Sequence, residues 1–306
     1  MSWVIVALLA PALSAIGTYA DKYLLVHKDR TGGLGSIVLF SCLFGALILP
    51  VAILFGAKAS NVSTFEAVIL MLNGFLTVGT LAAYLYAIRE SDVISIVPVL
   101  QTIPVFGFML GFFILGETLT PLELAGSIII VLSALLLSFE IEDDAKVRFR
   151  AKSFFYAVLA SFLFAVSGVV FKLIAIDKGY WTTQFWEYVG ISILGVLLFA
   201  FVRSYRHSFL QVLKYRRTGV VLLNFSTEAI MVSADLLLNF ATLLAPIALV
   251  YAVNSFQPAF LLAFAFIGWF MFPKLMYPLA ILQKHIVLKI LAIGIMITGA
   301  IIVHVA

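Results

Sequence analysis

Ten apolar stretches, each about 20 residues long and nearly free of charge, follow one another along this chain of 306 residues. Crossing the hydrocarbon core of a bilayer takes about 20 apolar residues in a helix. The stretches are continuous rather than alternating, which favours helices over the strands of a membrane barrel. The sequence therefore predicts an all-α membrane protein with ten transmembrane helices. The predicted spans are 3–25, 35–56, 66–88, 93–115, 121–139, 153–176, 182–202, 219–241, 246–272 and 286–305.

Composition excludes the main classes of soluble protein. Hydrophobic residues make up 64% of the chain and charged residues 11%, against about 45–50% and 25% in soluble domains. A soluble enzyme, a nucleic-acid binder and a disordered regulator are therefore not expected. The first apolar stretch has no basic region before it, so it does not resemble a cleaved signal peptide. The single cysteine, Cys42, excludes an intrachain disulfide, and the four scattered histidines form no metal-ligand spacing. We expect no metal and no cofactor.

The basic residues predict an orientation in the membrane. With ten spans, the odd-numbered loops share one face, and the even-numbered loops share the other face with both termini. Of the 19 Lys and Arg, 15 fall in odd-numbered loops and two, Lys58 and Lys178, on the other face; Lys22 and Lys172 lie within spans. The positive-inside rule places the odd-numbered loops in the cytoplasm and both termini outside. The expected location is the cell (inner) membrane.

The two halves of the chain resemble each other. Residues 7–22 match residues 157–172 at six of 16 positions, and Pro104 of the fourth span matches Pro258 of the ninth at a similar shift. Each half has five spans, an odd number, so the two copies must cross the membrane in opposite directions. Inverted repeats are typical of transporters that bind substrate near the midplane and work by alternating access.

One segment also resembles a known family. Ser95–Leu137 (SIVPVLQTIPVFGFMLGFFILGETLTPLELAGSIIIVLSALLL) has a span with prolines, a turn with Gly116 and Glu117, and a fifth span rich in small residues. This pattern resembles the EamA half of the drug/metabolite transporter superfamily. The resemblance implies EamA-like five-helix repeats at 1–140 and 153–306, joined by a cytoplasmic linker at 141–152. It also implies a central cavity lined by spans 1, 3, 4, 6, 8 and 9, with spans 5 and 10 at the periphery.

The eighth span carries the clearest polar stripe. Asn224, Glu228, Asp235 and Asn239 are spaced by 4, 7 and 4 residues, so they fall on one face of a helix. Charged residues at the centre of a bilayer are costly and are functional candidates by default. Two buried carboxylates favour a proton site or a cation-binding site, whereas the alternative is a stripe satisfied by neighbouring helices. We predict a substrate or proton role for Asn224, Glu228 and Asp235.

Further candidates lie on other spans. The third span carries a matching stripe of neutral polar residues, and the fourth and ninth spans carry amides beside prolines, which free backbone carbonyls for a ligand or permit a kink. The candidate residues on these spans are Asn73, Thr77, Tyr84, Gln101, Asn254 and Gln257.

Lys22, Lys172 and Glu187 complete the candidate site. Lys22 and Lys172 end the first and sixth spans at opposite faces, where they either form ion pairs, attract an anionic substrate or snorkel to the interface. Glu187, about one turn inside the seventh span, is a potential partner of Lys172.

Two hypotheses for function follow. The first is a secondary transporter that moves a small polar metabolite such as an amino acid, with or without proton coupling, and the resemblance favours export. The second is an intramembrane enzyme acting on a lipid-linked substrate, but no HExxH motif, Cys/His grouping or nucleophile elbow supports it. We therefore expect no catalytic residues. The expected partners are a small-molecule substrate and membrane lipids, without nucleic acid. Small residues such as Gly126 and Gly299 favour close helix packing, either within the chain or in a homodimer.

Overall fold

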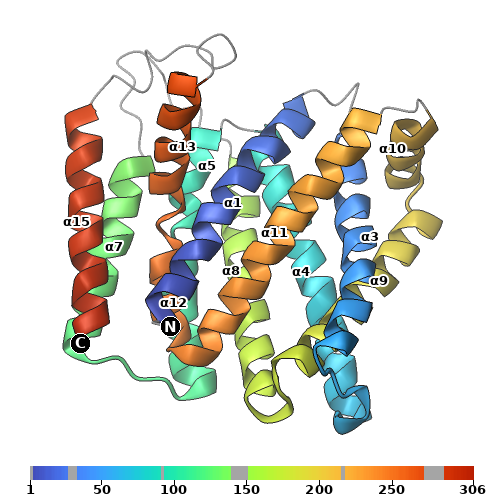
Figure 1. Cartoon of the computed structure of the whole chain (residues 1–306), viewed down its shortest axis with the longest axis horizontal. Helices are drawn as coiled ribbons and strands as arrows, with labels where there is room; N and C mark the ends of the chain where they lie inside the picture. Colours follow the sequence, from blue (N-terminus) through green and yellow to red (C-terminus); the bar gives the residue numbers. More distant parts are fainter. Residues whose placement is uncertain (1–2, 27–32, 91–92, 139–150, 215–217, 272–285) are drawn as a thin grey trace.

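The structure, a computed structural model, describes residues 3–26, 33–90, 93–138, 151–214, 218–271 and 286–306. The described residues contain helices and no strand, and both termini lie at the same end of the bundle (Figure 1). The elements before the predicted linker are α1 (Trp3–Val26), α3 (Gly33–Leu54), η1 (Ala59–Asn61), α4 (Thr64–Glu90), α5 (Val93–Leu100), α6 (Ile103–Leu110), η2 (Gly111–Leu115) and α7 (Pro121–Ser138). The elements after it are α8 (Ala151–Lys178), α9 (Tyr180–Phe201), α10 (Arg203–Lys214), α11 (Thr218–Leu244), α12 (Ile247–Asn254), α13 (Gln257–Met271) and α15 (Ile286–Val305).

The helices have the length and composition of membrane spans, as the sequence predicts. Nine helical segments in the described part of the chain are long and apolar enough to cross a bilayer, and Pro121–Leu137 is a shorter apolar helix. Large apolar side chains such as Leu54 and Phe201 are more than three-quarters exposed. Such exposure is unfavourable in water but matches a surface that faces lipid. Most of the predicted linker lies outside the described residues, and α8 already begins at Ala151.

The fourth and ninth spans are each broken near the middle, where the sequence predicts continuous helices. The fourth is divided into α5 and α6 at Gln101 and Thr102, and the ninth into α12 and α13 at Ser255 and Phe256. Each break lies two to three residues before a proline, Pro104 or Pro258. Proline has no N–H to donate to the carbonyl four residues earlier, so the regular helical hydrogen bonding stops there.

Basic residues of the predicted loop 203–217 belong to a short amphipathic helix, α10. Its Phe209 ring lies 4.8 Å from the ring of Phe40 on α3, and Val212 is buried. Leu210 and Leu213 remain exposed. The helix is attached to the bundle through α3 and α9 and still presents apolar side chains outward, as interfacial helices do.

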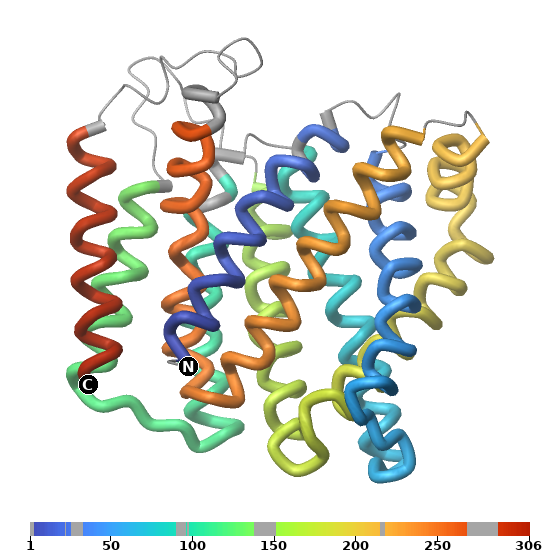
Figure 2. Tube along the Cα trace, viewed as in Figure 1, coloured from blue at the N-terminus to red at the C-terminus, as the bar shows by residue number. Residues whose placement is uncertain are grey.

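Helix packing follows a symmetrical pattern. α1 packs along α11, and α4 packs along α8, so each of these pairs joins a helix of residues 1–140 to one of residues 153–306 (Figure 2). α3 packs against α9, and α7 against α15. At the α7–α15 contact, a Cβ added to Gly126 would lie 3.0 Å from the backbone oxygen of Gly299. These two glycines therefore bring two helices of one chain together.

Candidate functional site

A cavity of about 220 Å³ lies among the helices. Residues of α1, α4, α5, α6, α8, α11, α12 and α13 line it, in agreement with the spans that the EamA resemblance implies. α3 and α9 also contribute, through Ser41 on α3 and Gln184, Glu187, Tyr188 and Ile191 on α9. No described residue of α7 or α15 lines the cavity. The cavity thus lies between the crossing pairs α1–α11 and α4–α8.

Four carboxylates face this cavity. Asp21 comes from α1, Glu187 from α9, and Glu228 and Asp235 from α11. Asp21, Glu187 and Glu228 are 2%, 4% and 6% exposed, whereas Asp235 is exposed toward the cavity itself. The described residues that line the cavity include no Lys, Arg or His. The cavity wall is therefore strongly acidic.

Glu187 is held in place by a close crossing of α4 and α9. A side chain on Gly74 of α4 would overlap the backbone oxygen of Glu187, and one on Gly190 of α9 would overlap the backbone of Met71. Because both residues are glycines, the helices approach closely enough for the Thr77 hydroxyl to donate a hydrogen bond of 2.8 Å to Glu187 Oε1. The other oxygen, Oε2, is buried and has no hydrogen-bond partner among the described residues.

The predicted stripe on α11 points largely into the cavity. Glu228, Asp235 and Asn239 line it. Glu228 and Asp235 are seven residues apart, which separates them by about 10 Å along the helix axis. Asn224 is buried but does not line the cavity, and its amide nitrogen donates to the Val220 carbonyl at 2.8 Å. Asn224 therefore lies behind the cavity wall in this structure, and its substrate or proton role stays a prediction.

Aromatic side chains form part of the wall. Tyr84, Phe164, Tyr188 and Tyr251 line the cavity, and Tyr84 is a predicted site residue. The Tyr251 ring lies between α6 and α8, where any side chain on Gly107 or Gly168 would overlap it. Glycine at these two positions thus allows Tyr251 to reach the cavity. The wall therefore combines carboxylates with aromatic side chains.

The break between α12 and α13 places two amides in the cavity wall. Asn254 and Gln257, on either side of the α12–α13 break, both line it, and the Gln257 amide nitrogen donates to Thr18 Oγ1 on α1 at 3.0 Å. At the α5–α6 break, Gln101 is 6% exposed but does not line the cavity.

Asn73 is also absent from the cavity wall. Its side chain is buried, and neither polar atom of its amide has a hydrogen-bond partner among the described residues. The stripe predicted on α4 therefore reaches the cavity only through Thr77 and Tyr84.

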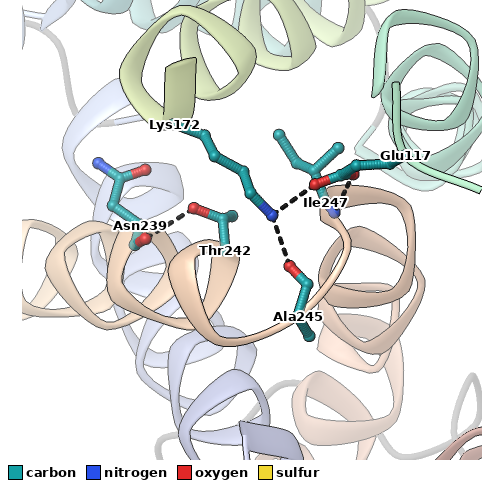
Figure 3. A network of polar contacts seen from close by, with 6 residues as sticks. All are labelled: Glu117, Lys172, Asn239, Thr242, Ala245 and Ile247. Atoms are coloured by element: carbon teal, nitrogen blue, oxygen red, sulfur yellow. Dashed lines mark hydrogen bonds and ion pairs between the residues drawn. The ribbon is translucent and has the colours of Figure 1, made fainter. Parts of the chain in front are cut away.

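Lys172 lies outside the cavity wall in a separate polar network (Figure 3). Its Nζ is 2.5 Å from Glu117 Oε1 and donates to the Ala245 carbonyl at 2.7 Å. The Ile247 N–H donates to Glu117 Oε2 at 2.8 Å. The predicted Lys172–Glu187 pair is therefore wrong, because Lys172 turns toward the α11–α12 junction. Snorkelling is also wrong for Lys172, whose side chain is 9% exposed.

A special turn brings Glu117 to this network. The π-helical turn η2 ends at Gly116, which adopts a left-handed conformation with φ of 67°. This conformation is readily available to glycine. A Cβ on Gly111 would lie 3.1 Å from Glu117 Oε2 and overlap the Ile247 side chain. The two glycines thus allow the chain to fold back so that Glu117 contacts both α8 and the start of α12.

Asp21 is the main residue that sequence reasoning missed. Ala10, Ser14, Thr18 and Asp21 are spaced by 4, 4 and 3 residues and all line the cavity from α1. That spacing is the signal by which the small and polar face of α1 could have been recognised. The prediction instead used Lys22, whose backbone belongs to α1 but whose side chain lies outside the described part of the structure.

The described part of the chain has the features of a multi-pass membrane protein, with an acidic cavity among its helices. Residues 1–139 match the model of the EamA-like transporter family. This match confirms the resemblance found in Ser95–Leu137 for the first half of the chain, and it is consistent with a membrane transporter of the drug/metabolite transporter superfamily. Members of this family are transporters rather than enzymes.

Two further comparisons concern the whole chain. One protein of known crystal structure shares the fold over 98% of this chain and 94% of its own, with a TM-score of 0.58 and 14% sequence identity. That likeness shows the fold alone. No curated protein sequence matches the chain.

Proposed function

We propose that the protein is a secondary transporter that exports a small polar metabolite by alternating access. The observation that carries this proposal is the arrangement of cavity and polar network. The cavity reaches Thr77, Ser167 and Asp235 near the middle of their helices, whereas the Glu117–Lys172 network lies beyond it toward the end that holds both termini. In this proposal the network closes that end of the cavity in the present conformation.

The network joins parts of the chain that must separate when this end opens. Glu117 belongs to the turn before α7, whereas Lys172, Ala245 and Ile247 come from α8 and the α11–α12 junction. Opening the cavity toward the termini would break these contacts, and closing it would restore them. A charged pair that forms only when this end is closed stabilises the closed state relative to the open one. An alternating-access cycle depends on such differences between states.

Transport would be driven by a gradient or by exchange, since the sequence has no ATP-binding loop. Among the cavity carboxylates, Glu228 and Asp235 are our candidates for the groups that bind either a proton or the substrate. In either role the bound proton or substrate would compensate the negative charge of the carboxylate, because an uncompensated buried charge is costly.

We also propose that the protein lies in the cell (inner) membrane with both termini outside. The described part of this end has Lys58 and Lys178, whereas the opposite end has residues such as Arg89, Arg203 and Lys214. Single cysteines at exposed positions 58 and 214, each in a Cys42→Ala background, would test this orientation. In intact cells a membrane-impermeant maleimide should label position 58 and not position 214. The reverse pattern would contradict it.

Counterflow in proteoliposomes tests the transport function. Vesicles loaded with a pooled library of small metabolites should take up at least one labelled member of the library, whereas protein-free vesicles should not. If a pH gradient increases the uptake rate, proton coupling is supported. If the gradient does not change the uptake rate, exchange is supported. Folded protein that exchanges no member of the library would contradict the proposed function.

A further inference from the structure

We propose that the substrate is an organic cation, an alkyl diamine with an amino group at each end, held by the cavity carboxylates. This inference rests on the proposed transport function and specifies the substrate class. It differs from the amino acid expected from the sequence. That expectation depended on a mixed lining of lysines and carboxylates, and Lys172 is engaged elsewhere by Glu117.

The charge of the wall supports a cation. Asp21, Glu187, Glu228 and Asp235 face the cavity, and the described lining residues supply no basic side chain to balance them. The carboxylate of an amino acid would find hydroxyl and amide groups there, but no cationic side chain among the described lining residues. An anionic group removed from water without a cationic partner is strongly disfavoured. A ligand that carries only positive charge avoids that cost and compensates the negative charge of the cavity carboxylates.

Glu187 offers a specific point of attachment. Thr77 occupies Oε1, while Oε2 is buried without a hydrogen-bond partner among the described residues. Glu187 as a whole is 4% exposed and lines the cavity. Buried polar atoms are normally hydrogen-bonded, so the unpaired oxygen indicates a ligand that donates. An ammonium group has three N–H donors and no acceptor, which complements this oxygen.

The distribution of the carboxylates favours two amino groups rather than one. Glu228 and Asp235 are separated by about 10 Å along α11, and Asp21 and Glu187 come from different helices, α1 and α9. A single ammonium group cannot contact carboxylates so far apart. Two amino groups joined by a flexible chain can each reach one.

The aromatic residues suit the chain between the amino groups. The aromatic residues that line the cavity are Tyr84, Phe164, Tyr188 and Tyr251. Aromatic rings pack against methylene groups and attract nearby ammonium groups through cation–π interactions. The volume of about 220 Å³ is below the roughly 300–1,000 Å³ typical of pockets for drug-sized ligands. A short alkyl diamine therefore fits better than a bulky aromatic cation.

A series of related probes isolates the role of charge: three have five carbons each, and lysine adds a carboxylate to the diaminopentane chain. Counterflow in proteoliposomes would use labelled 1,5-diaminopentane, lysine, 5-aminopentanoate and glutarate, which differ in the number of amino and carboxyl groups. We expect the diamine to be exchanged at least 10-fold faster than 5-aminopentanoate, and glutarate not at all. Faster exchange of lysine or 5-aminopentanoate than of the diamine would overturn the inference.

Variants connect the preference to the cavity. Glu187→Gln should reduce diamine exchange at least 10-fold, whereas Asp177→Asn, which changes an exposed carboxylate outside the cavity wall, should leave it unchanged. Equal exchange by wild type and Glu187→Gln would overturn the role of Glu187. The melting temperature of the wild type gives a readout independent of any variant, and the diamine should raise it more than lysine does.

The same measurements separate this inference from the proposed function. If other library metabolites are exchanged but the diamine neither exchanges nor raises the melting temperature, the substrate class is wrong and transport stands. If the diamine raises the melting temperature but no solute is exchanged, the cation site stands and transport is wrong. If neither stabilisation nor exchange is observed with any solute, both are wrong.

Discussion

Lys172 and Glu117 are 55 residues apart in sequence, yet their charged atoms lie 2.5 Å apart (Figure 3), toward the end of the bundle that holds both termini (Figure 1). The Lys172 ammonium also donates to the Ala245 carbonyl, and Glu117 also accepts from the Ile247 N–H. Removing one partner would leave the other largely buried without an opposite charge, with only its backbone hydrogen bond. Breaking a buried pair in this way costs about 3–5 kcal/mol, so the pair is well suited to holding this end closed.

The first prediction concerns closure of that end. Glu117→Gln and Lys172→Met should each open it more often, because each leaves a buried charge without its partner. Asn239→Cys in a Cys42→Ala background places a probe in the cavity wall. An impermeant maleimide added from the side of the termini should label this cysteine about 10-fold faster in either variant. In the double variant the increase in labelling rate should be smaller than the sum of the two single increases, because neither charge is then left without its partner. Unchanged labelling in both single variants would show that the pair does not control access.

The second prediction concerns the support of Glu187. Thr77→Val removes the hydroxyl that donates to Glu187 Oε1 and preserves the size of the side chain. A hydrogen bond to a charged group contributes about 1.5–3 kcal/mol, so we expect the KM for the transported substrate to change by roughly 10-fold or more. Thr80→Val is the matched control, since Thr80 also lines the cavity but donates to Leu76 of its own helix. Equal effects of the two substitutions would contradict a specific role for the Thr77 hydroxyl.

The third prediction concerns the close crossing of α4 and α9. Gly74→Ala introduces a methyl group that overlaps the backbone oxygen of Glu187. Overpacking of this kind costs about 1–3 kcal/mol, so the melting temperature in detergent should fall. Gly294→Ala is the comparison, because a Cβ at Gly294 has nothing within 4 Å beyond its own helix. Alanine is preferred over glycine within helices by about 1 kcal/mol, so that variant should be neutral or more stable. A neutral Gly74→Ala would mean that the helices can separate without cost.

The fourth prediction concerns Glu228 and Asp235. If protons and a cationic substrate compete for these carboxylates, acidification should raise the KM for substrate, because a protonated carboxyl group no longer attracts a cation. Glu228→Gln and Asp235→Asn should each reduce transport and flatten its dependence on pH. Normal transport with an unchanged pH profile in both variants would exclude a role for these carboxylates.

The residues on one helix face were predictable, whereas contacts between helices were not. The spacing of Glu228 and Asp235 along one span places both on the same face, and both line the cavity. The same argument placed Asn224 there, but neighbouring helices cover that part of α11. Periodicity gives the direction of a side chain around its own helix and carries no information on which helix it meets.

The partner of Lys172 illustrates this limit. Glu117 was recognisable only as part of a turn with Gly116, and the contact depends on the π-helical turn that precedes it. Neither the turn type nor the neighbouring α11–α12 junction follows from local spacing. Asp21 is the opposite case, since its place on the polar face of α1 was readable from Ser14 and Thr18.

The contact between α7 and α15 has a consequence for how the molecule would move. Gly126 and Gly299 approach so closely that an added Cβ on either would lie within about 3 Å of the other's backbone oxygen. Two helices that interlock in this way have little room to slide, since any shift would drive side chains into the neighbouring backbone. If the halves rock during transport, they would then rotate about the α7–α15 contact. The halves would stay joined there while the cavity changes the face to which it opens.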